Sequence, residues 1–149
     1  MRIIIGSDHR GFALKEELKA RLMEGGHTVE DVSAPAPDPA DDYPDYGAAV
    51  GRAVAADPEA RGIVLCGSGV GIAIAANKVP GVRAGTCATP EQAVAARADE
   101  DMNVLALSAD ALDATRAQAV VDVFLATPFS GAERHVRRVG KIQQLEHAP

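Results

Sequence analysis

Aromatic residues and cysteines are scarce in this sequence. Phe, Tyr and Trp together make up 3% of the 149 residues, tryptophan is absent, and there are two cysteines. Two cysteines are too few for the disulfide framework of a small secreted domain, and neither shows paired zinc-ligand spacing with a histidine. We therefore expect two reduced thiols, no metal site, and a core built mainly from Ala, Val, Ile and Leu.

Long hydrophobic runs and an excess of positive charge are also missing. No apolar stretch approaches the roughly 18 residues of a membrane-spanning helix. The N-terminal segment becomes polar at Ser7, unlike a signal peptide. The formal net charge of -6 argues against nucleic acid or an anionic membrane as a partner. These absences predict a soluble cytoplasmic protein that binds neither nucleic acid nor a membrane.

Hydrophobic residues are nevertheless plentiful, at 47% of the sequence. This content fits one domain, residues 1–149, with a substantial core. Five short apolar segments alternate with segments of helical pattern, and they lie at residues 2–6, 28–32, 63–65, 83–87 and 103–107. The alternation predicts a Rossmann-like α/β fold, a three-layer α/β/α sandwich with a five-stranded parallel sheet and a C-terminal helix ending near Glu146.

Polar signals mark the expected helix starts and one long loop. Thr89 to Gln92 offers a Thr cap and a Pro at the first helical position, and Ser130 to Glu133 matches a capping box. Residues 33–45 form a Pro- and Asp-rich loop with Tyr43 and Tyr46 at its far end. These tyrosines either line the mouth of a pocket or anchor the loop.

A strand-loop-helix segment is predicted at residues 62–78. An apolar run ends there at Cys66, and Gly67, Gly69 and Gly71 follow at a spacing of two. Glycines at this spacing let backbone N–H groups approach a ligand closely, so the segment predicts an anion site with a thiol at its rim. Such a turn can also serve only to pack a helix on a sheet. The spacing excludes the GxGxxG and GxxxxGK[ST] phosphate loops.

Two further groups of polar residues are candidates for a site. Asp8 and His9 follow the first predicted strand, at the carboxyl end where open α/β sheets bind ligands. Asp8 can equally cap the following helix, and His9 can be an ordinary loop residue. Near the C-terminus, the cluster of Arg134, His135, Arg137 and Arg138 forms either a solvated basic face or a phosphate clamp, and the acidic charge of the chain adds weight to the clamp.

Five pieces of the sequence together resemble one enzyme family. They are SDHRGFALK at residues 7–15, DYPDYG at 42–47, LCGSGVGIAIAANKVPGVRA at 65–84, NVLAL at 103–107 and SGAERHVRRV at 130–139. In content and order they are similar to ribose-5-phosphate isomerase type B and to the galactose-6-phosphate isomerase subunits, which form one sugar-phosphate isomerase family. The resemblance covers nearly the whole chain.

The resemblance implies a cofactor-free aldose–ketose isomerase, with ribose 5-phosphate and ribulose 5-phosphate as first candidates for substrate and product. It implies that Cys66 is the base that moves a proton between C1 and C2, with Ser68 beside the reacting carbons. The chemistry agrees, because this reaction needs a base for a carbon-bound proton and donors that hold the enediolate. A helix N-terminus favours the thiolate form of a cysteine, although a buried inert thiol is the alternative.

The same resemblance implies the substrate contacts. The backbone of residues 67–71 matches the oxyanion-binding loop, and Asp8 and His9 match a substrate-contacting pair. Arg134 and Arg138 match arginines that reach the phosphate from the neighbouring subunit, which implies a homodimer with shared active sites, whose dimers can pair into tetramers. The expected substrate-binding residues are Asp8, His9, Tyr43, Gly67, Gly69, Val70, Gly71, Glu100, Arg134 and Arg138.

Three acidic residues depart from the family's pattern. Asp99 and Glu100 stand where the family commonly has a His-Asn pair whose histidine assists ring opening, and Asp110 stands where many members have a phosphate arginine. Asp99 is then the expected ring-opening residue. The replacements also fit a substrate that cannot close a furanose ring, such as a tetrose or tetrulose 4-phosphate. A non-catalytic subunit and a nucleotide-binding module are further alternatives, and Cys66 argues against both.

Overall fold

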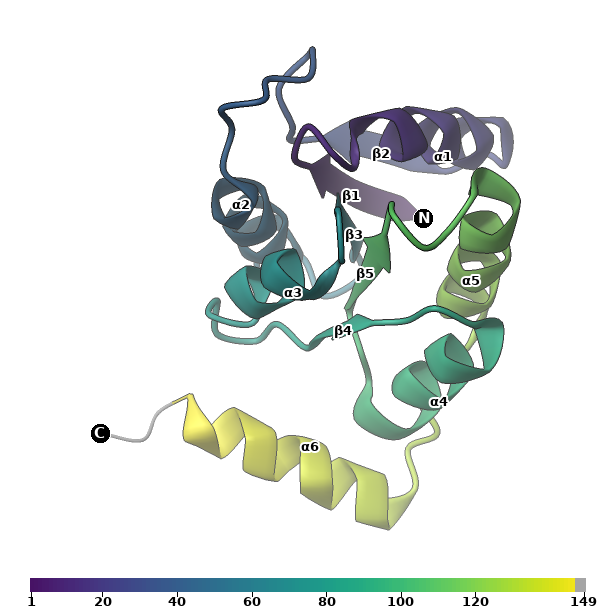
Figure 1. The fold of residues 1–149 in the computed structure, drawn as a ribbon. Coiled ribbons are helices and arrows are strands. Elements are labelled where there is room, and N and C mark those ends of the chain that lie inside the picture. The colour runs from purple at the N-terminus through teal and green to yellow at the C-terminus, as the bar shows by residue number, and fades with distance from the viewer. Residues whose placement is uncertain (147–149) are drawn as a thin grey trace.

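Five parallel strands form the central sheet of the computed structural model, which describes residues 1–146 (Figure 1). The strands are β1 (Arg2–Ser7), β2 (Thr28–Asp31), β3 (Arg61–Cys66), β4 (Ala84–Thr86) and β5 (Val104–Ser108). Their order in the sheet is β2-β1-β3-β5-β4. In register, Ile5 lies opposite Ile63, which lies opposite Leu105. The three inner strands therefore end side by side at one edge.

Helices cover both faces of this sheet. One layer holds α2 (Tyr43–Ala55) and α3 (Val70–Ala76), and the other holds α1 (Phe12–Glu24), α4 (Pro90–Glu100) and α5 (Ala114–Ala126). The last helix, α6 (Glu133–Leu145), packs against α4 and lies at the bottom edge of the view (Figure 1). The predicted three-layer sandwich with a C-terminal helix is confirmed. No helix in the described part of the chain has the length and apolar character needed to cross a membrane.

The inner strands divide their side chains between two cores. Ile3 and Ile5 of β1 pack with α1 and α5, whereas Ile4 packs with α2 and α3. Both faces of the strand are buried, which explains why its apolar run does not alternate with polar residues. Phe124 is the one fully buried aromatic side chain among the described residues. The cores are otherwise mainly aliphatic, as the composition predicts.

One predicted helix start is confirmed and another is wrong. The Thr89 hydroxyl oxygen accepts the N–H of Gln92 at 3.3 Å, as expected for an N-cap. The capping box at Ser130 does not form, because the N-cap of α6 is Ala132. Ser130 Oγ lies 2.7 Å from Nδ1 of the buried His135 instead. The serine therefore fixes a histidine rather than a helix end.

The start of α2 also differs from the expected one. The helix begins at Tyr43 and not at the expected Tyr46, so residues 43–45 belong to it and not to the preceding loop. Pro44 lies in the first turn, where its missing N–H has no partner to lose. The sequence was misleading here because a proline beside aspartates is also typical of a loop.

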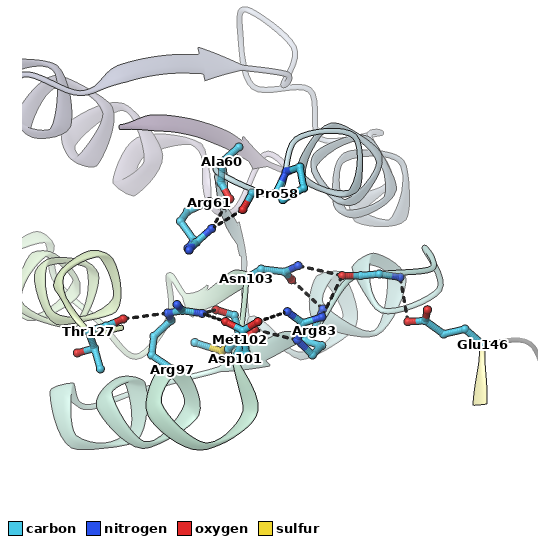
Figure 2. Close-up of polar contacts among 11 residues, drawn as sticks. Pro58, Ala60, Arg61, Arg83, Arg97, Asp101, Met102, Asn103, Thr127 and Glu146 are labelled. Atoms are coloured by element: carbon cyan, nitrogen blue, oxygen red, sulfur yellow. Dashed lines mark hydrogen bonds and ion pairs between the residues drawn. The ribbon is translucent and has the colours of Figure 1, made fainter. Parts of the chain in front are cut away.

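An arginine network fixes the turn between α4 and β5 (Figure 2). Asp101 ends α4 with a φ of 49°, a left-handed conformation that is uncommon outside glycine. Arg83 donates to the carboxylate of Asp101 at 2.7 Å and to its backbone carbonyl at 2.8 Å. The buried Arg97 donates to the other carboxylate oxygen of Asp101 at 2.9 Å. These bonds hold the turn, and with it the preceding Asp99 and Glu100.

A buried lysine joins α1 to the end of β2. Lys15 is fully buried, and its Nζ lies 2.7 Å from Asp31 and 2.9 Å from Glu16. Lys19 binds the same Asp31 carboxylate at 2.8 Å. Burial raises the pKa of Asp31, but the hydrogen bonds from Lys15 and Lys19 outweigh it and lower the pKa to about 2.

Replacing Asp31 by Asn should therefore destabilise the fold by about 3 kcal/mol at pH 7, because the buried Lys15 ammonium loses a counter-ion. The folded pKa of Asp31 lies below its usual 3.8, so its stabilisation is complete above about pH 4 and is lost as the pH falls toward 2. Urea unfolding at fixed protein concentration measures both effects. Asp57→Asn, which breaks an exposed ion pair with Arg2, is the control and should change little. If Asp31→Asn lowered the free energy of unfolding equally at pH 7 and pH 2, Asp31 would not be the counter-ion of Lys15.

Candidate active site

The segments that follow β1, β3 and β5 meet at the carboxyl end of the sheet and line a pocket of about 460 Å³. The loop before α2 and the first turns of α2 and α3 complete its wall. A pocket of this size is ordinary for a small-molecule site. The lining residues are Asp8, His9, Arg10, Asp41, Tyr43, Cys66, Gly67, Ser68, Val70, Gly71 and Asp110. Most of the residues predicted for the site therefore come together in one chain.

Cys66 lies at the end of β3, with 4% of its surface exposed. Its Sγ accepts the N–H of Gly69 at 3.2 Å, so a backbone donor points at the sulfur. The turn requires glycine at 69, because φ is 76° and a Cβ would lie 2.9 Å from the backbone carbon of Leu107. The exposed Ser68 lines the same pocket, and its Oγ accepts the N–H of Val70 at 3.2 Å.

His9 is held by Asp41, a residue that the sequence did not single out. Nδ1 of His9 lies 2.6 Å from Oδ1 of Asp41, which also accepts the backbone N–H of His9 at 3.2 Å. Burial raises the pKa of Asp41, but the hydrogen bonds from His9 outweigh it and lower the pKa. The carboxylate is therefore ionised at neutral pH and Nδ1 is the donor, which leaves Nε2 to meet a ligand.

Asp8 combines the two roles that the sequence left open. Its buried carboxylate accepts the N–H groups of Arg10 and Gly11, each at 3.0 Å, and so fixes the entry to α1. Asp8 also lines the pocket. The capping bonds hold its side chain in place at the pocket wall.

Tyr43 lies at the mouth of the pocket, where 41% of its surface is exposed. Its ring packs against Gly71, since a Cβ at 71 would lie 2.7 Å from the ring. Tyr46 packs against the core under α2 and α3 instead, and burial together with the charge of Asp41 raises its pKa. The first tyrosine thus lines the pocket and the second anchors α2.

Arg10 and Asp110 form an ion pair at the edge of the pocket, with Nη2 and Oδ2 2.6 Å apart. The guanidinium lies against Gly67, because a Cβ at 67 would meet Cζ of Arg10 at 2.6 Å. The sequence marked Asp110 as a departure from the family's pattern but missed Arg10. The two residues are 100 positions apart, so no local pattern pairs them.

Four predicted site residues lie away from this pocket. Asp99 and Glu100 end α4, and Arg134 and Arg138 are exposed on α6, on the far side of the molecule from the loops after β1 and β3 (Figure 1). Asp99 lies 3.5 Å from Nδ1 of His135, within the same chain. One chain therefore presents two separate groups of predicted site residues. The resemblance anticipates this separation for the two arginines.

Comparison with known proteins shows which family the chain belongs to. Residues 3–142 match the family model described as Ribose/Galactose Isomerase. The chain belongs to the ribose/galactose isomerase family. It is 41% identical to ribose-5-phosphate isomerase B of Escherichia coli, over 97% of this chain and 96% of that protein. It is also 41% identical to ribose-5-phosphate isomerase B of Mycolicibacterium paratuberculosis, over 98% of this chain and 92% of that protein.

Solved structures of ribose-5-phosphate isomerase B have the same fold. The protein from Clostridium thermocellum is 44% identical, with a TM-score of 0.93 over 99% of this chain and 98% of that one. The protein from Mycoplasma genitalium, solved with bound ribulose 5-phosphate, is 37% identical, with a TM-score of 0.95 over 99% and 97%. Membership in the ribose/galactose isomerase family confirms the resemblance and the predicted class of enzyme, an aldose–ketose isomerase.

The backbone constraint in the turn after Cys66 can be tested by substituting Gly69. An alanine at 69 costs about 1–2 kcal/mol for its left-handed backbone, and its Cβ would also press on Leu107. Gly26→Ala is the matched control, because φ there is 83° and nothing lies within 4 Å of the added carbon. We expect Gly69→Ala to lose more stability in urea unfolding than Gly26→Ala. Equal losses would show that the turn relaxes without cost.

Proposed function

We propose that this chain interconverts ribose 5-phosphate and ribulose 5-phosphate through an enediolate, with Cys66 as the base and without a cofactor. The observation that carries the proposal is the Cys66 thiol in the pocket, with the Gly69 N–H donated to its sulfur at 3.2 Å. Two findings support the substrate. Relatives that align over nearly their whole length are named ribose-5-phosphate isomerase B, and the Mycoplasma genitalium relative binds ribulose 5-phosphate.

In the proposed reaction the Cys66 thiolate removes the proton on C2 of the open-chain aldose and returns it to C1. The negative charge that develops on the oxygens is held by donors of the loop at 67–71. Ser68 Oγ accepts from Val70, so its own O–H is available to donate to the substrate. No electrons leave the substrate, and the proposal therefore includes neither a metal nor a redox cofactor.

A second copy of the chain completes the site in this proposal. Ring opening and phosphate binding are the roles proposed for Asp99, Arg134 and Arg138, and none of these residues lines the pocket of its own chain. Apolar side chains are exposed on α3 and α6, as expected for surfaces that a partner covers. They are Val70, Ile74, Val136, Ile142 and Leu145, with 52%, 56%, 52%, 39% and 74% of their surfaces exposed. We therefore propose a homodimer with shared active sites, whose dimers can pair into tetramers, acting in the cytoplasm, where thiols stay reduced.

A tetrose 4-phosphate is the second candidate substrate, and the carboxylates at Asp99 and Asp110 favour it. A tetrose whose terminal oxygen bears phosphate has no furanose ring to open. Comparing kcat/KM for ribose 5-phosphate and erythrose 4-phosphate in wild type and in Asp99→His separates the two candidates. A clear preference for the tetrose that Asp99→His reverses would replace the pentose in this proposal.

The base is tested by Cys66→Ala. We expect a folded variant in which exchange of the C2 proton of ribose 5-phosphate with D2O, followed by NMR, falls by about 1,000-fold or more. Cys87→Ala removes the other buried thiol, which lies in the core on the opposite face of the sheet, and should stay active. Near-normal exchange in folded Cys66→Ala would reject the cysteine as the base.

Shared sites are tested by mixing two inactive variants. Cys66→Ala lacks the base and Arg138→Ala lacks a phosphate ligand that would serve the other subunit. Random subunit exchange should restore about a quarter of the wild-type activity, because half of the dimers are mixed and each has one intact site of two. Exchange is confirmed by mass spectrometry of the native dimer. Mixed dimers without activity would rule out sharing.

A further inference from the structure

We propose that Arg10 binds the phosphate group of the substrate from within the same chain, and that Asp110 positions the Arg10 side chain for this role. The inference rests on the proposed function, because it takes a sugar phosphate as the ligand of the pocket. It assigns a role to a residue outside the predicted site and to the acidic residue at 110.

Arg10 lies next to the proposed reacting centre. Its guanidinium lies against Gly67, the residue after Cys66, in space that any side chain at 67 would fill. Nη2 binds Asp110, while Nε and Nη1 donate to no residue in the described range 1–146. A guanidinium held by one nitrogen thus keeps two other nitrogens for a ligand. Arginine matches phosphate oxygens through such paired donors.

Asp110 is itself fixed to the loop that carries the thiol. Its backbone N–H donates to the carbonyl of Gly67 at 3.1 Å, and Ser108 Oγ donates to the same carbonyl at 2.8 Å. The backbone of Asp110, from which the carboxylate reaches Arg10, is therefore held against the turn that follows Cys66. This is why we assign Asp110 a positioning role.

The charges of the pocket favour an anion-binding role for Arg10. Three carboxylates line it, from Asp8, Asp41 and Asp110, and Arg10 is the one lysine or arginine among the lining residues of the described chain. His9 is already engaged by Asp41. A phosphate that enters this pocket needs a cation to offset the carboxylates, and one chain supplies it only through Arg10.

The ion pair with Asp110 leaves Arg10 free to adjust. The two side chains are 56% and 53% exposed, and ion pairs between exposed groups contribute little to stability. Arg10 can therefore rotate toward a phosphate at small cost to the fold. Removing it should affect ligand binding much more than folding, which separates this role from that of a surface ion pair.

The test measures binding of inorganic phosphate by calorimetry, and KM and kcat for ribose 5-phosphate. Wild type is compared with Arg10→Ala, Arg10→Lys and Asp110→Ala, and Arg52→Ala, an exposed arginine on α2 outside the pocket, is the control. We expect Arg10→Ala to raise the Kd of phosphate and the KM by about tenfold or more, with an unchanged melting temperature. Arg10→Lys should recover part of the loss, and Asp110→Ala should show a smaller loss.

Two failures are distinguishable. Wild type that binds phosphate but does not isomerise the sugar contradicts the proposed function, while the phosphate measurement still tests Arg10. An active wild type whose phosphate Kd and KM are unchanged in Arg10→Ala overturns the inference about Arg10 alone. A Kd that rises equally in Arg52→Ala would also overturn it, since the effect would then be one of net charge.

Discussion

The tight turn after β3 is the constraint on which the candidate site depends. Gly69 adopts a left-handed backbone against Leu107, and this conformation aims its N–H at the Cys66 sulfur. The neighbouring strand ends are tied to the same turn. Asp8 N–H donates to the carbonyl of Leu65 at 3.3 Å, and Ala109 N–H donates to that of Cys66 at 3.0 Å. The thiol therefore sits in a frame made by three strands rather than on a mobile loop.

The fold was largely predictable because its physical causes are local. The apolar runs predicted the buried strands, and the spacing of the glycines after Cys66 predicted the turn where the site lies. What the sequence could not predict depends on how distant segments meet. The loop at 33–42 contains three aspartates, and only the path of the folded chain brings Asp41 to His9. The pairing of Arg10 with Asp110 escaped prediction for the same reason.

The two separate groups of predicted site residues reflect how the chain is built. The pocket belongs to the ends of β1, β3 and β5, whereas the other group lies on α4 and α6. That second group is anchored firmly. Arg97 is buried and binds both Asp101 and the carbonyl of Thr127 (Figure 2), which ties the end of α4 to the segment before α6. Firm anchoring of this kind suits side chains that must reach into a partner's site, because moving a side chain by about an ångström weakens such a site.

The carboxylate of Asp99 has polar neighbours, unlike an isolated surface acid. Nδ1 of the buried His135 lies 3.5 Å from it, and Ser130 Oγ lies 2.7 Å from the same nitrogen. Since Ser130 Oγ can either donate to or accept from this nitrogen, the histidine can keep Nδ1 protonated toward Asp99 or present it as an acceptor. Asp99 is about half exposed and so remains open to a ligand on its other side. In the proposed dimer, Asp99 would offer the acid–base group, with the His135 ring behind it. Such a pair is chemically able to open a sugar ring, which keeps the pentose phosphate ahead of the tetrose as the proposed substrate.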